Sequence, residues 1–242
     1  MMTTDRDNLL DRLADDRARV AAAETLLASG VPLTGPPPTA LIDAVARGEA
    51  NRHQPLLDLA RAWSRPEMSR AALDAFHAAG SRQREEFAWL LKTVLAPEDG
   101  PEVIALVHAG TEEVQVRRWL IEALERLVRA DALGWAELGG VVEALSDERA
   151  ASLREALASL LMTLPWRAGN LRRLAPLLRD PDPMVVAAAA NALAGHPDAV
   201  RQIDHELLDD LRRHPHPLMS RAAAVLDAAL GGDMTRPTRG SE

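Results

Sequence analysis

The sequence contains no cysteine and no tyrosine, and its aromatic residues are limited to two phenylalanines and five tryptophans. Without cysteine the chain cannot form disulfides, and thiolate nucleophiles and cysteine-based zinc or iron–sulfur sites are excluded as well. Scarce aromatic residues speak against a fold built mainly of strands. The hydrophobic fraction of 47% consists mainly of alanine, leucine and valine, which favours helices that approach one another closely.

Long apolar runs and an excess of basic charge are also missing. No run reaches the roughly 18 apolar residues of a membrane span, and Met1–Asn8 carries charges where a secretory signal has its apolar core. We therefore expect a cytoplasmic protein that does not bind membranes. The formal net charge is −8, and Lys92 is the only lysine among 28 basic residues, which indicates a GC-rich bacterial genome. Because duplex nucleic acid is usually bound through a basic excess, this balance makes nucleic acid an unfavoured partner.

Catalytic motifs are absent from the sequence. It contains no GxSxG, no glycine-rich phosphate loop and no HExxH pattern. His205, His214 and His216 are close in sequence, but Pro215 places the last two at a turn, so we expect no metal site. Carboxylate doublets point about 100 degrees apart on a helix and do not form a shared-proton pair. We predict no catalytic residue, no metal and no cofactor, and an enzyme is the less favoured class.

The clearest positive signal is internal repetition. Residues 181–190 match residues 215–224 at an offset of 34, with two prolines and three consecutive alanines in common. The apolar pairs at 106–107, 141–142 and 177–178 recur at steps of 35 and 36. A period near 34 residues is typical of stacked helical hairpins. The sequence therefore predicts a repeat protein.

The turn and the second helix of each repeat have a physical logic. Asp182 can cap the helix that follows it, and Pro183 fits the first turn because no N–H is needed there. Ala188, Ala189 and Ala192 then form a face of small residues that can pack against a neighbouring helix.

This pattern resembles a HEAT repeat of the bacterial type that is grouped with bilin-lyase-like repeats. The resemblance rests on Leu177–Val185 and the alanine run after it, and it extends from Pro101 to Leu230. It implies an all-α fold, a right-handed α-solenoid of HEAT-like antiparallel helix pairs. The family has an arginine after the valine, as Arg117 follows Val116, and such an arginine braces neighbouring turns. Val186 replaces it in a later repeat, so irregular stacking is expected there.

Five segments are expected along the chain: an N-terminal capping helix (1–30), a proline-rich linker (31–39), irregular helical repeats (40–99), HEAT-like repeats (100–230) and a flexible tail (231–242). The expected helices are Asp5–Ser29, Gln54–Trp63, Glu67–Ala79, Arg82–Leu95, Pro101–Ala109, Glu112–Arg129, Trp135–Leu145, Glu148–Leu164, Leu171–Leu178, Met184–Ala194, Ala199–Arg213 and Leu218–Leu230.

The tryptophans allow two interpretations. Most of them are expected to fill gaps between helices where alanine leaves room. Alternatively, a groove of tryptophan and arginine resembles the HEAT-like alkylpurine DNA glycosylases, which implies DNA contacts and an acid, Glu86 or Glu122, beside the damaged base. The implied DNA-facing residues are Arg117, Arg118, Trp119, Trp166, Arg167, Arg172 and Arg173. The aspartate that this family has one turn after a tryptophan is missing, since Ala123 and Thr93 occupy those positions.

The favoured function is a scaffold or adaptor that binds another protein or a peptide on its concave face, formed by the second helix of each pair. Tryptophan and arginine are enriched in binding hot spots. The predicted partner-binding residues are Arg117, Arg118, Trp119, Arg154 and Arg221. The alternatives are a HEAT-like DNA glycosylase and a lyase-like or biosynthetic accessory subunit.

Overall fold

The protein is all-α. The computed structural model describes residues 2–232, and in this range it contains α-helices, one short 3-10 helix and no strand. This confirms the predicted all-α class. Gly231 and Gly232 belong to the last helix, whereas the remainder of the predicted flexible tail, residues 233–242, lies outside the described residues.

The chain divides into two compact units. Unit 1 runs to Leu133, and unit 2 begins at Gly134. The elements of unit 1 are α1 (Met2–Arg12), α2 (Arg19–Ala28), α3 (Thr39–Ala46), α4 (Gln54–Ala62), α5 (Arg65–Ala78), α6 (Ser81–Val94), η1 (Pro97–Asp99), α7 (Gly100–Ala109) and α8 (Val114–Arg129). Those of unit 2 are α9 (Trp135–Ser146), α10 (Ala151–Thr163), α11 (Ala168–Leu177), α12 (Pro183–Ala194), α13 (Pro197–Val200), α14 (His205–Arg213) and α15 (Pro217–Gly232).

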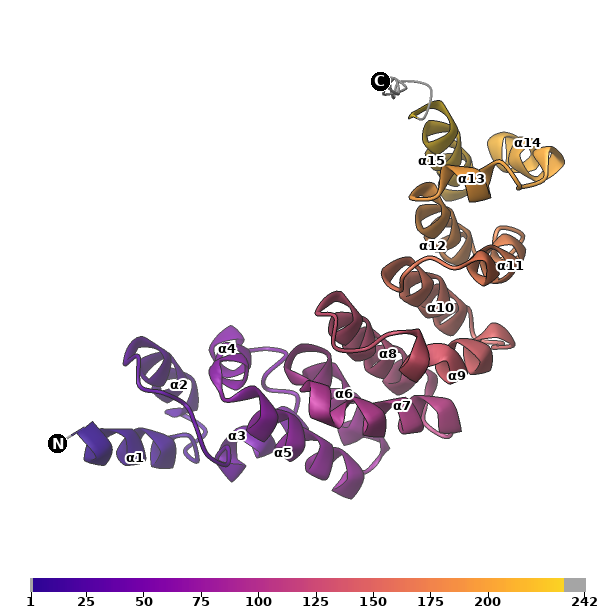
Figure 1. Cartoon of the computed structure of the whole chain (residues 1–242). Helices are drawn as coiled ribbons and strands as arrows, with labels where there is room; N and C mark the ends of the chain where they lie inside the picture. Colours follow the sequence, from indigo (N-terminus) through magenta and orange to yellow (C-terminus); the bar gives the residue numbers. More distant parts are fainter. Residues whose placement is uncertain (1, 233–242) are drawn as a thin grey trace, which may run out of the picture. The chain divides into compact units, whose positions relative to one another are not determined.

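Consecutive helices pack as neighbour pairs within each unit (Figure 1). In unit 1, α1 packs with α2, α3 with α4, α5 with α6, and α7 with α8. In unit 2 the pairs are α9 with α10, α11 with α12, and α14 with α15. The second helices of adjacent pairs also contact one another, from α2 through α4 and α6 to α8 in unit 1, and from α10 through α12 to α15 in unit 2. Each unit is therefore a repeat-like array of helix pairs.

Small residues form the seam between α12 and its neighbours. Ala189, Ala190 and Ala192 are buried together with Leu193, and Ala222 and Ala223 are buried on α15. Alanine side chains let two helix backbones approach closely, so this seam explains the contact between α12 and α15. Val186 is fully buried, so an apolar side chain fills the place where an arginine would need polar partners.

The two proline turns of unit 2 repeat the same hydrogen bonds 34 residues apart. Asp180 and Asp182 each accept a hydrogen bond, of 2.9 Å, from the amide two residues further on. His214 and His216 do the same through Nδ1, at 3.1 and 3.2 Å. The sequence repetition thus corresponds to a repeated turn structure, in which histidine takes the place of aspartate.

The N-terminal region differs from its expected single helix, because α1 and α2 are separated by residues 13–18. Arg19 stabilises this break by donating to the carbonyl oxygens of Leu13 and Ala14 at 2.6 and 3.4 Å. These carbonyl groups are outside the helix, so the guanidinium replaces their helical partners. The break therefore depends on a side chain that local helix propensity does not reveal.

One further difference concerns a single helix. The expected helix over Ala199–Arg213 is divided into α13 and α14, because Asp204 caps a new helix by accepting a 3.0 Å hydrogen bond from the amide of Glu206. The segment before α3 is irregular, and it is held in place by Trp63, whose Nε1 donates to the carbonyl oxygen of Gly35 at 2.7 Å.

Candidate functional site

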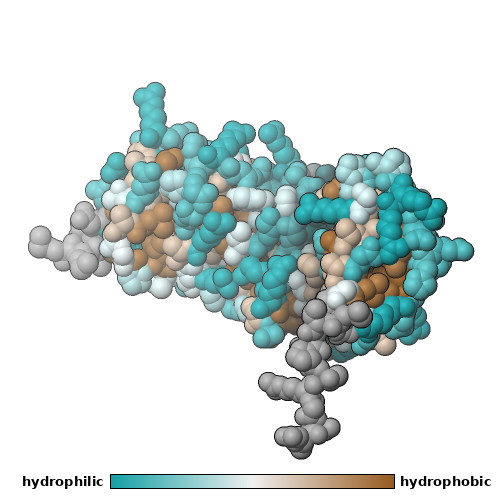
Figure 2. All heavy atoms as spheres, turned by 90° about the horizontal axis from the view of Figure 1, so that it is seen from above, coloured by the Kyte–Doolittle hydropathy of each residue, from teal (hydrophilic) through white to brown (hydrophobic). Residues whose placement is uncertain are grey.

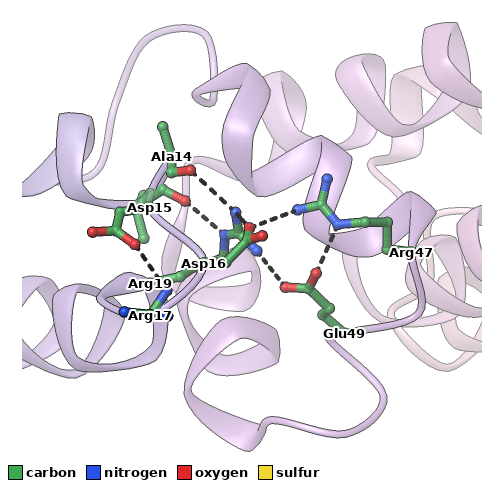
Figure 3. A network of polar contacts seen from close by, with 8 residues as sticks. Ala14, Asp15, Asp16, Arg17, Arg19, Arg47 and Glu49 are labelled. Atoms are coloured by element: carbon green, nitrogen blue, oxygen red, sulfur yellow. Dashed lines mark hydrogen bonds and ion pairs between the residues drawn. The ribbon is translucent and has the colours of Figure 1, made fainter.

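Three arginines connect neighbouring helix pairs in the same way. Arg19, Arg84 and Arg154 each donate to a carbonyl group just before their own helix and to a carboxylate of the next helix pair. Figure 3 shows the first of them, where the guanidinium of Arg19 lies between Asp16 and Glu49. Such contacts fix the distance between successive turns, so these arginines support the array itself.

Arg154, one of the predicted partner-binding residues, makes the best-defined of these contacts. Its Nε and Nη2 donate to the two carboxylate oxygens of Asp180 at 2.6 and 2.9 Å. The Asp180 side chain is 6% exposed and that of Arg154 is 18% exposed. The hydrogen bonds from Arg154 hold the pKa of Asp180 below its ordinary value, although burial opposes this shift. The Arg154 guanidinium is thus largely committed to an intramolecular ion pair.

Arg117 occupies the equivalent place on α8. Arg84, Arg117 and Arg154 are each the fourth residue of their helix. Arg117 is 6% exposed, and a methyl group on Gly110 would lie 3.9 Å from its Cζ, so its guanidinium faces the preceding turn. Arg117 therefore has little exposed surface for the partner-binding role that the sequence predicts for it.

Arg118 and Trp119 lie in a charged cluster on α6 and α8. The ammonium group of Lys92 is 4.2 Å from the centroid of the Trp119 ring, within cation–π range. Glu122 lies 3.2 Å from Lys92 and 3.4 Å from Arg118. Trp119 and Arg118 are half-buried. We call these four residues the Trp119 cluster; they form a surface of unit 1 with the residue types of a binding hot spot.

Arg221 is exposed beside a hollow between α12 and α15 in unit 2. The hollow has a volume of about 200 Å³ and is lined by Ala187, Asn191, Leu218, Arg221, Ala222 and Val225. Among the described residues, the Arg221 side chain forms no hydrogen bond or ion pair. We call this surface the Arg221 hollow; it belongs to the second helices, as expected for a binding face.

Three of the other four tryptophans are buried or take part in internal contacts. Trp63 is 3% exposed, and Trp135 donates through Nε1 to the carbonyl oxygen of Pro165 at 2.7 Å. Arg167 lies over the Trp135 ring at 4.9 Å. Trp166 stacks on His196, with centroids 3.8 Å apart and planes 20° apart, and burial lowers the pKa of that histidine. These contacts agree with the gap-filling interpretation.

Unit 1 also contains a cavity that no sequence motif indicates. Its volume is about 730 Å³, and it is lined by Ala46, Arg47, Arg52, Gly80, Ser81, Arg82, Gln83 and Glu86. The glycosylase interpretation of the sequence assigns Glu86 as an acid beside a tryptophan. The structure places Glu86 in a lining with three arginines, Arg47, Arg52 and Arg82. Arg47 and Arg82 are 35 positions apart, so only the repeat period could have suggested that they lie together.

Metal sites and membrane spans were also sought. No group of three or more potential metal ligands occurs among residues 2–232. In the same part of the chain, every helix is too short or too polar to cross a bilayer.

Comparisons with protein-family models, curated proteins and solved structures give no match.

Proposed function

We propose that the chain is a protein-binding scaffold, a solenoid of HEAT-like helix pairs that binds its partner on the face formed by the second helices. The observation that carries the proposal is the Arg221 hollow. There an exposed arginine, which has no hydrogen-bond or ion-pair partner among residues 2–232, borders a depression whose lining includes the small side chains of Ala187 and Ala222. Small residues admit a partner's side chain, and the guanidinium offers a charged hydrogen bond to it.

The Trp119 cluster supports the same proposal in unit 1. Its aromatic ring is half-buried and surrounded by Lys92, Arg118 and Glu122. An aromatic side chain with charged neighbours can bury apolar surface while the charges set the orientation of the partner. Because Arg117 is only 6% exposed and Arg154 is paired with Asp180, we assign direct partner contact to Arg118, Trp119 and Arg221 only.

The partner that fits the Arg221 hollow best is a peptide segment that presents an acidic residue. Its carboxylate would pair with Arg221, and an adjacent apolar side chain would enter the hollow. The amide of Asn191 in the lining offers both a donor and an acceptor to the segment's backbone.

Charge reversal tests this proposal. We expect Arg221→Glu to abolish capture of the partner from the native host, and to weaken the purified complex by about tenfold or more. The matched control is Arg213→Glu on α14, whose side chain is 75% exposed and lies away from the hollow. If both variants retain the partner to the same extent, or lose it to the same extent, the binding face is assigned wrongly.

The alternative of a DNA glycosylase has one supporting observation, the acid Glu86 in a basic cavity. The other acid considered, Glu122, is paired with Lys92 and Arg118. Retention on DNA that falls steeply with salt would favour this alternative, and retention that is absent at low salt would exclude it.

A further inference from the structure

The arginine-lined cavity of unit 1 has a local charge opposite to that of the whole chain. Its lining contains three arginines, Arg47, Arg52 and Arg82, and one acid, Glu86, whereas the chain as a whole has a formal charge of −8. Arg47 is also paired with Glu49 and Asp16, which lie outside the lining, so the excess of positive charge comes from Arg52 and Arg82. Converging cations repel one another, so a folded chain brings them together at a cost unless an anion is present. The cavity is therefore a candidate for binding an anionic ligand.

Two of the three arginines are available to a ligand. Among the described residues, the side chains of Arg52 and Arg82 form no hydrogen bond or ion pair. Arg47 is held in place by Glu49, at 2.7 Å from its Nε (Figure 3). One guanidinium is thus fixed at the cavity wall, and two can close on a bound group.

The N-terminus of α6 adds backbone donors to the same cavity. Ser81, Arg82 and Gln83 form its first turn and line the cavity. The amide of Gln83 already donates to the carbonyl oxygen of Gly80 at 2.9 Å, whereas the amides of Ser81 and Arg82 come before the first hydrogen bond of the helix and favour negative charge. The arginines therefore act together with a second, independent source of positive potential.

Glu86 is fixed rather than free to turn away. Asn51 donates from Nδ2 to one of its carboxylate oxygens. The other oxygen packs on Gly48, where a methyl group would lie only 2.8 Å away and where φ is +72°. Burial, and to a smaller degree Glu85, raises the pKa of Glu86. A carboxylate held in this way can share a proton with an acidic oxygen of a ligand.

We propose that this cavity binds a small molecule that carries a phosphate monoester, with Arg52, Arg82 and the first turn of α6 on the ionised oxygens and Glu86 on the remaining O–H. A phosphate group has enough oxygen atoms for all of these contacts at once. Its second pKa is about 6, so it keeps a proton at little cost near neutral pH. Sulfate is fully ionised there, and an ionised carboxylate has no O–H to offer to Glu86.

Calorimetric titration of the full chain tests the proposal, with glycerol phosphate, inorganic phosphate, sulfate and succinate as probes. We expect glycerol phosphate and phosphate to bind at least about tenfold more tightly than sulfate or succinate. Arg52→Ala and Arg82→Ala should each weaken phosphate binding by about tenfold or more, since each removes a charged hydrogen bond. The control Arg61→Ala removes an exposed arginine outside the cavity, and it should change nothing.

Glu86→Gln separates this proposal from mere attraction of anions. The glutamine retains an oxygen that can accept a hydrogen bond from Asn51 but lacks the carboxylate charge. Sulfate should therefore bind more tightly, and the ratio of the affinity for phosphate to that for sulfate should fall. Equal affinity for phosphate and sulfate in the unaltered chain, tighter binding of succinate, or no phosphate binding at about 10 mM would each overturn the proposal. An unchanged affinity in the Arg52→Ala/Arg82→Ala double variant would also overturn it. These outcomes leave the scaffold proposal intact, because Arg221 lies in unit 2.

Discussion

Arginine at the fourth position of a second helix has a structural task in this chain. Arg84 and Arg154 each donate to the carbonyl group five residues earlier and to an acid of the following helix pair. The planar guanidinium can serve both acceptors at once, which the single ammonium of a lysine does with poorer geometry. At these two positions arginine is therefore better suited than lysine.

Loss of the Arg154 brace should destabilise the fold. Arg154→Met leaves the Asp180 carboxylate buried without its charged partner, and we expect the free energy of unfolding to fall by about 2–3 kcal/mol. Arg213→Met is the matched control, because the Arg213 side chain is 75% exposed and its ion pair is 3.8 Å long; its effect should stay below about 0.5 kcal/mol. Urea titration measures both values, and equal losses would contradict the brace.

The Arg154–Asp180 pair should also make stability depend on pH. Arg154 lowers the pKa of Asp180 in the folded state below the ordinary 3.8. A carboxylate with a lowered folded pKa contributes stability above its unfolded pKa, and this contribution is lost as the pH falls through the folded value. The stability difference between the unaltered chain and Arg154→Met should thus be constant above about pH 5 and shrink below 3.8. A difference that stays constant down to pH 2 would contradict this interpretation.

Glu86 should show the opposite pH dependence. Folding raises its pKa above the ordinary 4.5, chiefly through burial, so the ionised form is disfavoured in the folded state. Glu86→Gln should therefore raise the melting temperature at neutral pH, and the gain should disappear below pH 4.5, where the acid is protonated in both states. Thermal melts at pH 7 and pH 4 measure this, and a lower melting temperature at pH 7 would contradict it.

At the scale of the helix, the equivalence of the two turns in unit 2 predicts that their N-cap residues, Asp182 and His216, can be exchanged. His216 caps α15 as Asp182 caps α12, but aspartate is the better N-cap and suits the positive end of the helix dipole. His216→Asp should stabilise the chain by about 0.5–1 kcal/mol, and Asp182→His should destabilise it by a similar amount. Chemical denaturation of the two variants measures the exchange, and a shift of the same sign in both would refute the equivalence of the turns.

Most helices of the second half could be predicted from the sequence because their signals are local, although the division of Ala199–Arg213 into α13 and α14 was not predicted. Asp182 and Pro183 begin α12, and Trp135 begins α9 as expected. The break between α1 and α2 could not be predicted in the same way, since it is stabilised by the Arg19 contact with Glu49, 30 residues away.

The candidate binding residues could likewise be predicted only as far as local sequence signals reach. Trp119 and Arg221 could be selected by residue type and helix position, but their exposure depends on packing. The arginine-lined cavity combines side chains from separate helix pairs, so residue type does not reveal it, and only the offset of 35 residues between Arg47 and Arg82 points to it. Arg117 and Arg154 were selected for residue type, and only their burial and contacts show that they face the turns.

At the scale of the whole molecule, the chain consists of two compact units that meet in sequence at Leu133 and Gly134. Each unit has its own array of second helices and its own candidate surface, the Trp119 cluster in unit 1 and the Arg221 hollow in unit 2. The view in Figure 2 is dominated by hydrophilic residues, with hydrophobic residues in separate patches between them. A surface of this kind fits binding through a few anchoring side chains better than binding through one large apolar interface.

Hydrogen–deuterium exchange of the chain with and without its partner tests the scaffold proposal most directly. The partner is defined as the protein whose capture is lost in Arg221→Glu and retained in Arg213→Glu. The account predicts that binding slows exchange in the second helices, most of all in α12 and α15, and leaves the first helices α9, α11 and α14 unchanged. Protection confined to those first helices would contradict it.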